Sequence, residues 1–126
     1  MPTILCVDDN RKTLRMLSSL FHMCGFSVVT AEGPADALAQ VKAMQFDLVV
    51  LDYEMLGLTG TACAQELRRI KPGIPILLHS GSPSIPEAEL DAVDACSAKG
   101  ESVDSLLRKV RDLLAIGTIR AQSTHF

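Results

Sequence analysis

The chain has 126 residues, a formal net charge of −3, 48% apolar residues and 4% aromatic residues, with no tryptophan. These values are typical of one globular domain with an aliphatic core, and they argue against a nucleic-acid partner, which needs clustered Lys and Arg or stacking rings. No apolar stretch approaches the roughly 18 residues of a membrane span, and the first residues lack the charged start of a signal peptide. The four cysteines form no C-x-x-C pair, which favours small buried side chains in a reducing compartment. We therefore expect a soluble cytoplasmic protein with no membrane partner.

Five short apolar runs punctuate the chain and are predicted to be strands. They are residues 3–7, 26–30, 46–51, 74–79 and, more weakly, 93–98. The first, third and fourth runs are nearly continuous in apolar residues, which indicates strands that are buried on both faces.

A helical pattern follows each predicted strand. In the first, apolar residues recur at three- and four-residue steps from Leu14 to Cys24, and Gly25 follows as a C-cap. Pro34 is suited to open the second. The other three predicted helices are residues 60–70, 87–92 and 103–114. Residues 117–126 lose the pattern, so we expect one domain over residues 1–116 and a disordered tail over 117–126.

The regular alternation of strand and helix predicts the fold class. Short connections between alternating elements imply parallel strands with right-handed crossovers, which gives a doubly wound α/β sandwich of three layers. In such a fold the functional crevice lies beyond the carboxyl ends of the strands. Residues that directly follow the predicted strands are therefore the first candidates for a functional site.

Carboxylates follow two of the predicted strands. Asp8 and Asp9 come directly after the first strand, and Asp52 comes directly after the third. If these strands are neighbours, three carboxylates converge at one sheet edge, where like charges repel and need a cation. Oxygen donors of this kind suit a hard ion, and Mg2+ characteristically takes one or two carboxylates together with water and phosphate oxygens.

Two further polar residues occupy equivalent strand ends. Ser80 follows the fourth strand and Lys99 follows the fifth. A hydroxyl and an ammonium that face a carboxylate–Mg2+ site form a phosphoryl-binding arrangement. Each residue alone has an ordinary explanation, because Asp9 or Asn10 could cap the first helix and Lys99 could be a solvated loop residue. The joint placement of five matched residues at four strand ends favours the functional interpretation.

At these residues the chain resembles the receiver domain of bacterial two-component response regulators. The resemblance covers about residues 3–116. It rests on Ile4-Leu5-Cys6-Val7-Asp8-Asp9-Asn10, Asp52-Tyr53-Glu54-Met55 with Gly60 following, Ser80-Gly81 and Ala98-Lys99. The resemblance implies a flavodoxin-like five-stranded sheet of order 2-1-3-4-5.

The resemblance also implies a role for each site residue. Asp52 is the expected phosphoacceptor, taking the phosphoryl group from a phosphohistidine of a histidine kinase or a histidine phosphotransfer protein in a phosphorelay. Asp9 and Asp52 are expected to bind Mg2+ directly, Asp8 through water, and Glu54 through its backbone carbonyl. Ser80 and Lys99 are expected to hold the phosphoryl oxygens. The family is not enzymatic beyond phosphorylating itself from donors and slowly removing its own phosphoryl group.

Three departures from the family pattern bear on output. Leu56 stands where the family usually has Pro, so the acceptor loop starts with more freedom. Gly100 replaces the usual Pro after Lys99, and a non-proline cis bond costs about 2.5–4 kcal/mol, so this bond is either trans or held by strong context. Cys96 replaces the usual Tyr or Phe that moves with the Ser/Thr hydroxyl. We therefore expect phosphorylation to reorder residues 80–86 and the fourth helix without a ring switch.

Several functions remain in competition. The first is a phosphorylation switch without its own output domain, which presents the face between the fourth and fifth helices to an unknown downstream protein. A degenerate receiver that binds a partner without phosphorylation is the main alternative. A Mg2+-dependent phosphatase of the haloacid-dehalogenase type needs Asp-x-Asp, which neither acidic motif supplies. A flavodoxin-like FMN carrier is disfavoured because Asp8 and Asp9 would repel its phosphate.

Overall fold

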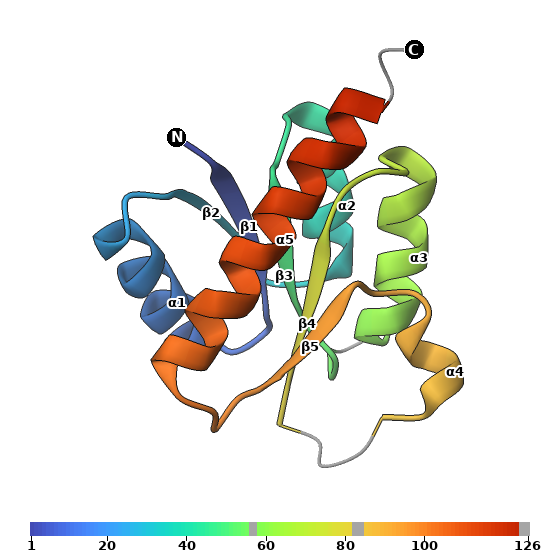
Figure 1. The fold of residues 1–126 in the computed structure, drawn as a ribbon. Helices are drawn as coiled ribbons and strands as arrows, with labels where there is room; N and C mark the ends of the chain where they lie inside the picture. Colours follow the sequence, from blue (N-terminus) through green and yellow to red (C-terminus); the bar gives the residue numbers. More distant parts are fainter. Residues whose placement is uncertain (56–57, 82–84, 124–126) are drawn as a thin grey trace.

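Strands and helices alternate along the whole chain, as predicted (Figure 1). The structure, a computed structural model, describes residues 1–55, 58–81 and 85–123. The strands are β1 (Thr3–Val7), β2 (Ser27–Ala31), β3 (Leu48–Asp52), β4 (Ile76–Ser80) and β5 (Ala95–Ala98). The helices are α1 (Arg11–Met23), α2 (Pro34–Ala43), α3 (Gly60–Ile70), α4 (Glu87–Leu90) and α5 (Val103–Ser123). Leu56 and the middle of the 80–86 loop lie outside the described residues.

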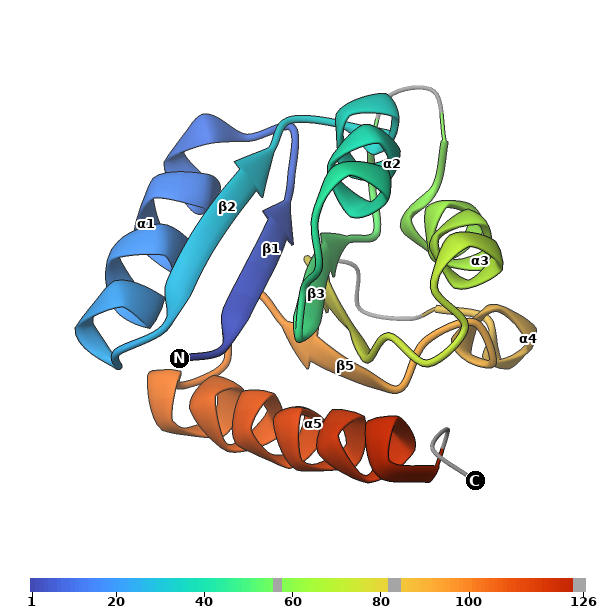
Figure 2. The ribbon, with the colours of Figure 1, turned by 90° about the horizontal axis from the view of Figure 1, so that it is seen from above.

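The five strands form one parallel sheet in the order β2-β1-β3-β4-β5. Helices α1 and α5 pack on one face, and α2 and α3 pack on the other (Figure 2). The predicted three-layer, doubly wound fold with order 2-1-3-4-5 is therefore confirmed. From β1 the chain adds β2 on one side of the sheet and then β3, β4 and β5 on the other side, so the topological switch point lies between β1 and β3. A ligand crevice is expected at this point in such a sheet.

The core consists of two mainly aliphatic layers, one on each face of the sheet, and the layer under α1 and α5 also contains the buried ring of Phe21. Strands β3 and β4 are buried at every position, as their continuous apolar sequences predicted. All four cysteines are free thiols; Cys6 and Cys63 are fully buried, whereas Cys24 and Cys96 are partly exposed. The described residues include no helix with the length and apolar character needed to cross a membrane.

Strands β3 and β4 begin and end later than their apolar runs predicted. Pro75 has no backbone N–H to donate to a ladder, so β4 starts at Ile76 rather than at residue 74. The ladder also extends to the pairs Asp52–His79 and Ser80–Ala98, so Asp52 is the last residue of β3 and Ser80 is the last residue of β4. Both side chains are therefore held by sheet backbone, which gives them a fixed position at the strand ends.

Helix α5 runs further than its predicted end. It continues through residues 117–123, where the sequence pattern predicted a tail. Gly117 allows a close approach to β4, because a Cβ there would lie 2.9 Å from Pro75 Cγ. Three residues on, Arg120 Nη2 lies 2.6 Å from Asp94 Oδ1, and Asp94 also binds Arg68 Nη2 at 2.6 Å. These contacts with Pro75 and Asp94, the residues directly before β4 and β5, stabilise the last turns of the helix.

Candidate functional site

The strand register brings the acidic residues together at the carboxyl end of the sheet. Val7 pairs with Leu51, so Asp8, which directly follows β1, lies beside Asp52, the last residue of β3. Asp8 is 1% exposed and Asp52 is 4% exposed, whereas Asp9 faces solvent. Each of the three carboxylates offers an oxygen within 4.8 Å of the others. The convergence that the sequence predicted is therefore present.

Asn10 is the N-cap of α1; the sequence had left either Asp9 or Asn10 as the capping residue. The Asn10 side-chain oxygen accepts from Lys12 N at 2.9 Å and from Thr13 N at 3.4 Å, as expected for an N-cap. Asp8 Oδ1 accepts from the Asn10 backbone N–H at 2.9 Å. Asp9 is not the N-cap of α1, and its carboxylate remains with the acidic cluster.

Lys99 lies between the two buried carboxylates. Its Nζ is 3.0 Å from Asp52 Oδ1 and 3.1 Å from Asp8 Oδ2. Burial disfavours the ammonium, but the hydrogen bonds to Asp52 and Asp8 outweigh this effect and raise the pKa of Lys99. The Lys99 backbone N–H donates to Ser80 O at 2.8 Å, which joins the ends of β5 and β4.

Asp52 is the carboxylate whose ionisation is most affected by this environment. Burial raises the pKa of Asp52 to about 6, the hydrogen bond from Lys99 opposes the increase, and the negative charge of Asp8 adds to it. The Glu54 backbone N–H also donates to Asp52 and lowers the pKa. A single ammonium thus compensates three clustered carboxylates only in part, and a bound cation would favour the ionised form of Asp52.

The cluster opens into a pocket of about 690 Å³. Its lining comprises Asp8, Asp9, Asn10, Asp52, Tyr53, Glu54, Met55, Thr59, Gly81 and Lys99. Ser80 is 4% exposed and lies at the end of β4, directly before the pocket residue Gly81. The structure therefore brings Asp8, Asp9, Asp52, Glu54 and Lys99 to one pocket, with Ser80 at its edge.

The two ends of the loop between β3 and α3, which we call the acceptor loop after the role expected of Asp52, make contacts that the sequence did not indicate. Tyr53 OH donates to Glu89 Oε2 of α4 at 2.9 Å, and Thr61 Oγ1 donates to Glu89 Oε1 at 3.0 Å. Gly60 N donates to Tyr53 O at 2.7 Å, and a Cβ on Gly60 would overlap the backbone of Asp52. Tyr53 and Glu89 are 36 residues apart, so no local pattern could have revealed this contact.

The residues present fit a divalent magnesium ion. The available donors are carboxylate oxygens of Asp8, Asp9 and Asp52, which are hard ligands of the kind that Mg2+ prefers. Two of the carboxylates are buried, so their charge is poorly screened by water. The open volume of the pocket leaves room for the water and phosphate oxygens that complete the coordination of this ion.

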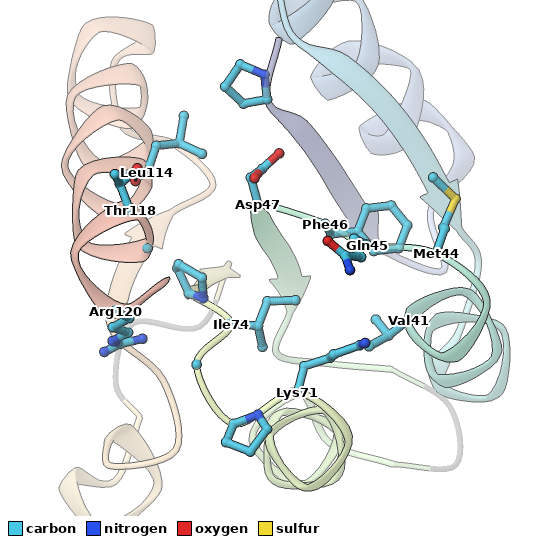
Figure 3. A pocket seen from close by; sticks show the side chains of 15 residues that line it. Val41, Met44, Gln45, Phe46, Asp47, Lys71, Ile74, Leu114, Thr118 and Arg120 are labelled. Carbon is cyan, nitrogen blue, oxygen red and sulfur yellow. Dashed lines mark hydrogen bonds between the residues drawn. The ribbon is translucent and has the colours of Figure 1, made fainter. Parts of the chain in front are cut away.

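A second pocket lies at the opposite, amino end of the strands (Figure 3). It measures about 580 Å³ and is lined by apolar side chains together with Asp47, Lys71 and Arg120. Figure 3 shows Leu114, Thr118 and Arg120 on α5 at one side of this pocket and Lys71 at the end of α3 on another side. None of the predicted site residues lines this pocket, so the acidic pocket is the candidate site.

Comparison with known proteins indicates the same class of protein as the acidic pocket does, a response regulator receiver domain. The family model for the response regulator receiver domain matches residues 4–110. The chain is 37% identical over 92 residues to the transcriptional regulatory protein ZraR of Salmonella typhimurium, an alignment that covers 73% of this chain and 21% of ZraR. It spans about a fifth of the length of the first curated relatives it matches.

Solved structures match over nearly the whole domain. The response regulator TrrA of Thermotoga maritima, in complex with Mg2+-BeF, has a TM-score of 0.85 and 32% identity, covering 90% of this chain and 99% of TrrA. TrrA in complex with the histidine kinase ThkA matches with a TM-score of 0.84 and 33% identity, covering the same shares of the two chains. The chain belongs to the response regulator receiver domain family.

Proposed function

We propose that this receiver domain is a Mg2+-dependent phosphorylation switch in which Asp52 accepts a phosphoryl group from a phosphohistidine. The donor is a histidine kinase or a histidine phosphotransfer protein of a two-component or phosphorelay pathway. The observation that carries the proposal is the arrangement of Asp8, Asp9 and Asp52 around Lys99 in one pocket, with Lys99 Nζ 3.0 Å from Asp52 Oδ1. The complexes of TrrA with Mg2+-BeF and with a histidine kinase support both the ion and the class of donor.

The chemistry is a transfer between two nucleophiles. A carboxylate oxygen of Asp52 attacks phosphorus, the new O–P bond forms as the P–N bond of phosphohistidine breaks, and the imidazole keeps the electron pair. Lys99 offsets negative charge on the phosphoryl oxygens as its contact with Asp52 is replaced. Asp8, Asp9, Asp52 and the Glu54 carbonyl would hold Mg2+, which supplies positive charge for the transferring group. Water then slowly hydrolyses the acyl phosphate, and no other turnover is proposed.

The output route departs from a ring switch because Cys96 occupies the position of the usual aromatic residue. We propose that α4 reports the phosphorylation state through the acceptor loop, since Tyr53 OH already binds Glu89 of α4 at 2.9 Å. Movement of the loop that carries Tyr53 would then change the position of α4. The downstream protein is expected to contact the face between α4 and α5. That the domain acts without an output domain of its own stays a prediction, because the relatives are several times longer.

A phosphorylation assay tests the proposal directly. The protein is incubated with Mg2+ and acetyl phosphate, and the expected result is one added phosphoryl mass that Asp52→Asn abolishes. The matched control is Asp36→Asn, which makes the same change at an exposed position on α2 and should label like wild type. Wild-type protein that takes up no phosphoryl group from acetyl phosphate or from a phosphohistidine protein would instead favour the degenerate receiver.

A further inference from the structure

The turn between β5 and α5 carries Lys99 into the acidic pocket, yet it contains little that restricts it locally. Gly100 follows Lys99, the bond between them is trans, and a Cβ on Gly100 would meet no atom within 4 Å. Backbone hydrogen bonds hold the two sides of the turn, from Lys99 N to Ser80 O and from Glu101 N to Ala98 O. Neither a proline ring nor side-chain packing at residue 100 fixes the path of the chain.

Glu101 supplies a restraint at the next position. Its carboxylate accepts from the Ser97 hydroxyl on β5, from Ser105 Oγ on α5 at 2.8 Å, and from Lys109 Nζ at 3.0 Å to each oxygen. Lys109 also donates to the carbonyl of Cys96 at 2.8 Å. One carboxylate, 19% exposed, therefore joins the last residues of β5 to the first two turns of α5.

These contacts are not those of a helix cap. Ser102 already caps α5, since its Oγ accepts from Ser105 N at 3.2 Å. The three donors to the Glu101 carboxylate are all side chains, one of them on the preceding strand, so the carboxylate connects the two sides of the turn rather than terminating the helix. Charged hydrogen bonds of this kind restrict geometry more than a single neutral bond does.

We propose that Glu101 is a positioning residue for Lys99: by joining β5 to α5 it holds the Lys99-Gly100 turn so that the ammonium lies between Asp8 and Asp52. This inference rests on the proposed function, in which Lys99 binds the phosphoryl oxygens. A lysine side chain is long and flexible, so the placement of its ammonium depends on where its backbone is held. A displacement of about 1 Å at a reacting group can cost up to about 100-fold in rate.

Loosening this turn should lower the rate of phosphorylation and raise the affinity for Mg2+. Phosphorylation should become slower because the ammonium no longer offsets charge on the phosphoryl group. Mg2+ binding should become tighter because Lys99 occupies the same carboxylates, 3.0 and 3.1 Å away, and its positive charge opposes the ion. General damage to the pocket would weaken both processes, so the opposite signs separate positioning from unfolding.

The test compares Glu101→Ala with Asp104→Ala, which removes the same charge from an exposed side chain three residues further on. Tyr53 is the single tyrosine, the chain has no tryptophan, and Tyr53 lines the pocket, so its fluorescence reports Mg2+ binding. In Glu101→Ala we expect phosphorylation by acetyl phosphate to slow about tenfold and the Mg2+ Kd to fall about twofold. Asp104→Ala should leave both values at the wild-type level. A Glu101→Ala protein that matches Asp104→Ala in both measurements overturns the inference.

A second comparison asks whether Glu101 acts through Lys99. If it does, Lys99→Ala/Glu101→Ala should have the same phosphorylation rate and Mg2+ affinity as Lys99→Ala, because coupled residues are not additive. A double variant with weaker Mg2+ binding than Lys99→Ala would show a general structural role instead. Should Glu101→Ala not fold, Lys109→Met removes the main donor to Glu101 and is expected to show the same pair of changes. If wild type takes no phosphoryl group the proposed function fails, while the Mg2+ measurements still decide the role of Glu101.

Discussion

A methyl group added to Gly60 should slow phosphorylation at Asp52, the proposed acceptor, without changing any ionisable side chain. Gly60 is the first residue of α3, and its Cβ would lie 2.7 Å from Tyr53 Cα and closer still to the Asp52 carbonyl oxygen. Carbon atoms normally approach to about 3.5–4.0 Å, so the two backbones must separate by roughly 0.8 Å or more. The Gly60 N–H bond to Tyr53 O, now 2.7 Å, would lengthen with them.

The size of the effect follows from that displacement. Overpacking costs about 1–3 kcal/mol, and replacing Gly by Ala in a helix returns up to about 1 kcal/mol, which leaves a net loss near 1–2 kcal/mol. For a domain of this size that loss lowers Tm by about 5 °C. A shift approaching 1 Å at Asp52 should slow phosphorylation by up to about 100-fold.

Two assays check this prediction for Gly60→Ala. Thermal unfolding followed by circular dichroism measures the stability loss, and mass spectrometry with acetyl phosphate and Mg2+ measures the rate of labelling. The control is Gly33→Ala, because Gly33 also lies at a helix start, has an extended backbone, and has no atom within 4 Å of an added Cβ. If Gly60→Ala melts and becomes labelled like Gly33→Ala, the steric argument is refuted.

Three further predictions concern Asp94, Glu54 and Glu89. Asp94→Ala should lower the free energy of unfolding in urea by about 2–3 kcal/mol, because it leaves two partly buried guanidinium groups without their carboxylate partner. Arg11→Ala, at an exposed ion pair, should lower it by less than about 1 kcal/mol. Burial opposes ionisation of Asp94, but its arginine and backbone partners outweigh burial and hold its pKa below the usual range. The stabilisation is thus complete at neutral pH and should be lost as pH falls below about 4. Glu54→Ala should change the lifetime of the phosphoryl group through access of water to the pocket; an unchanged dephosphorylation rate would contradict this role. Glu89→Ala, but not the exposed Glu87→Ala, should speed amide hydrogen exchange in α4, and equal exchange in both would rule out the link to the acceptor loop.

Local sequence signals were sufficient to predict the architecture. Apolar runs and helical periodicity predicted the alternation of ten elements, and that alternation implied the parallel three-layer sheet. The same signals identified the site, because Asp8, Asp9, Asp52, Ser80 and Lys99 all lie at or directly after strand ends. In a parallel sheet the carboxyl ends meet at one edge, so the sequence alone predicts that these residues, distant along the chain, lie close together.

Element ends were predicted less well where distant contacts decide them. Helix α5 extends through Ser123 because Arg120 binds Asp94 and Gly117 packs against Pro75. The sequence of residues 117–123 is polar and lacks a periodic apolar face. Its helical state is stabilised by partners elsewhere in the chain, which periodicity within the segment does not detect.

The sequence by itself determined the fold class, the acidic site and the expected chemistry of Asp52, because each depends on residue type and on position relative to a strand end. Only the tertiary structure shows which contacts hold the backbone near Lys99 and next to Asp52. Glu101 joins β5 to α5 next to the Lys99-Gly100 turn, and Glu89 of α4 binds Tyr53, which follows Asp52. These restraints are contacts between side chains of different elements, and their existence depends on how the elements pack rather than on any pattern along the chain.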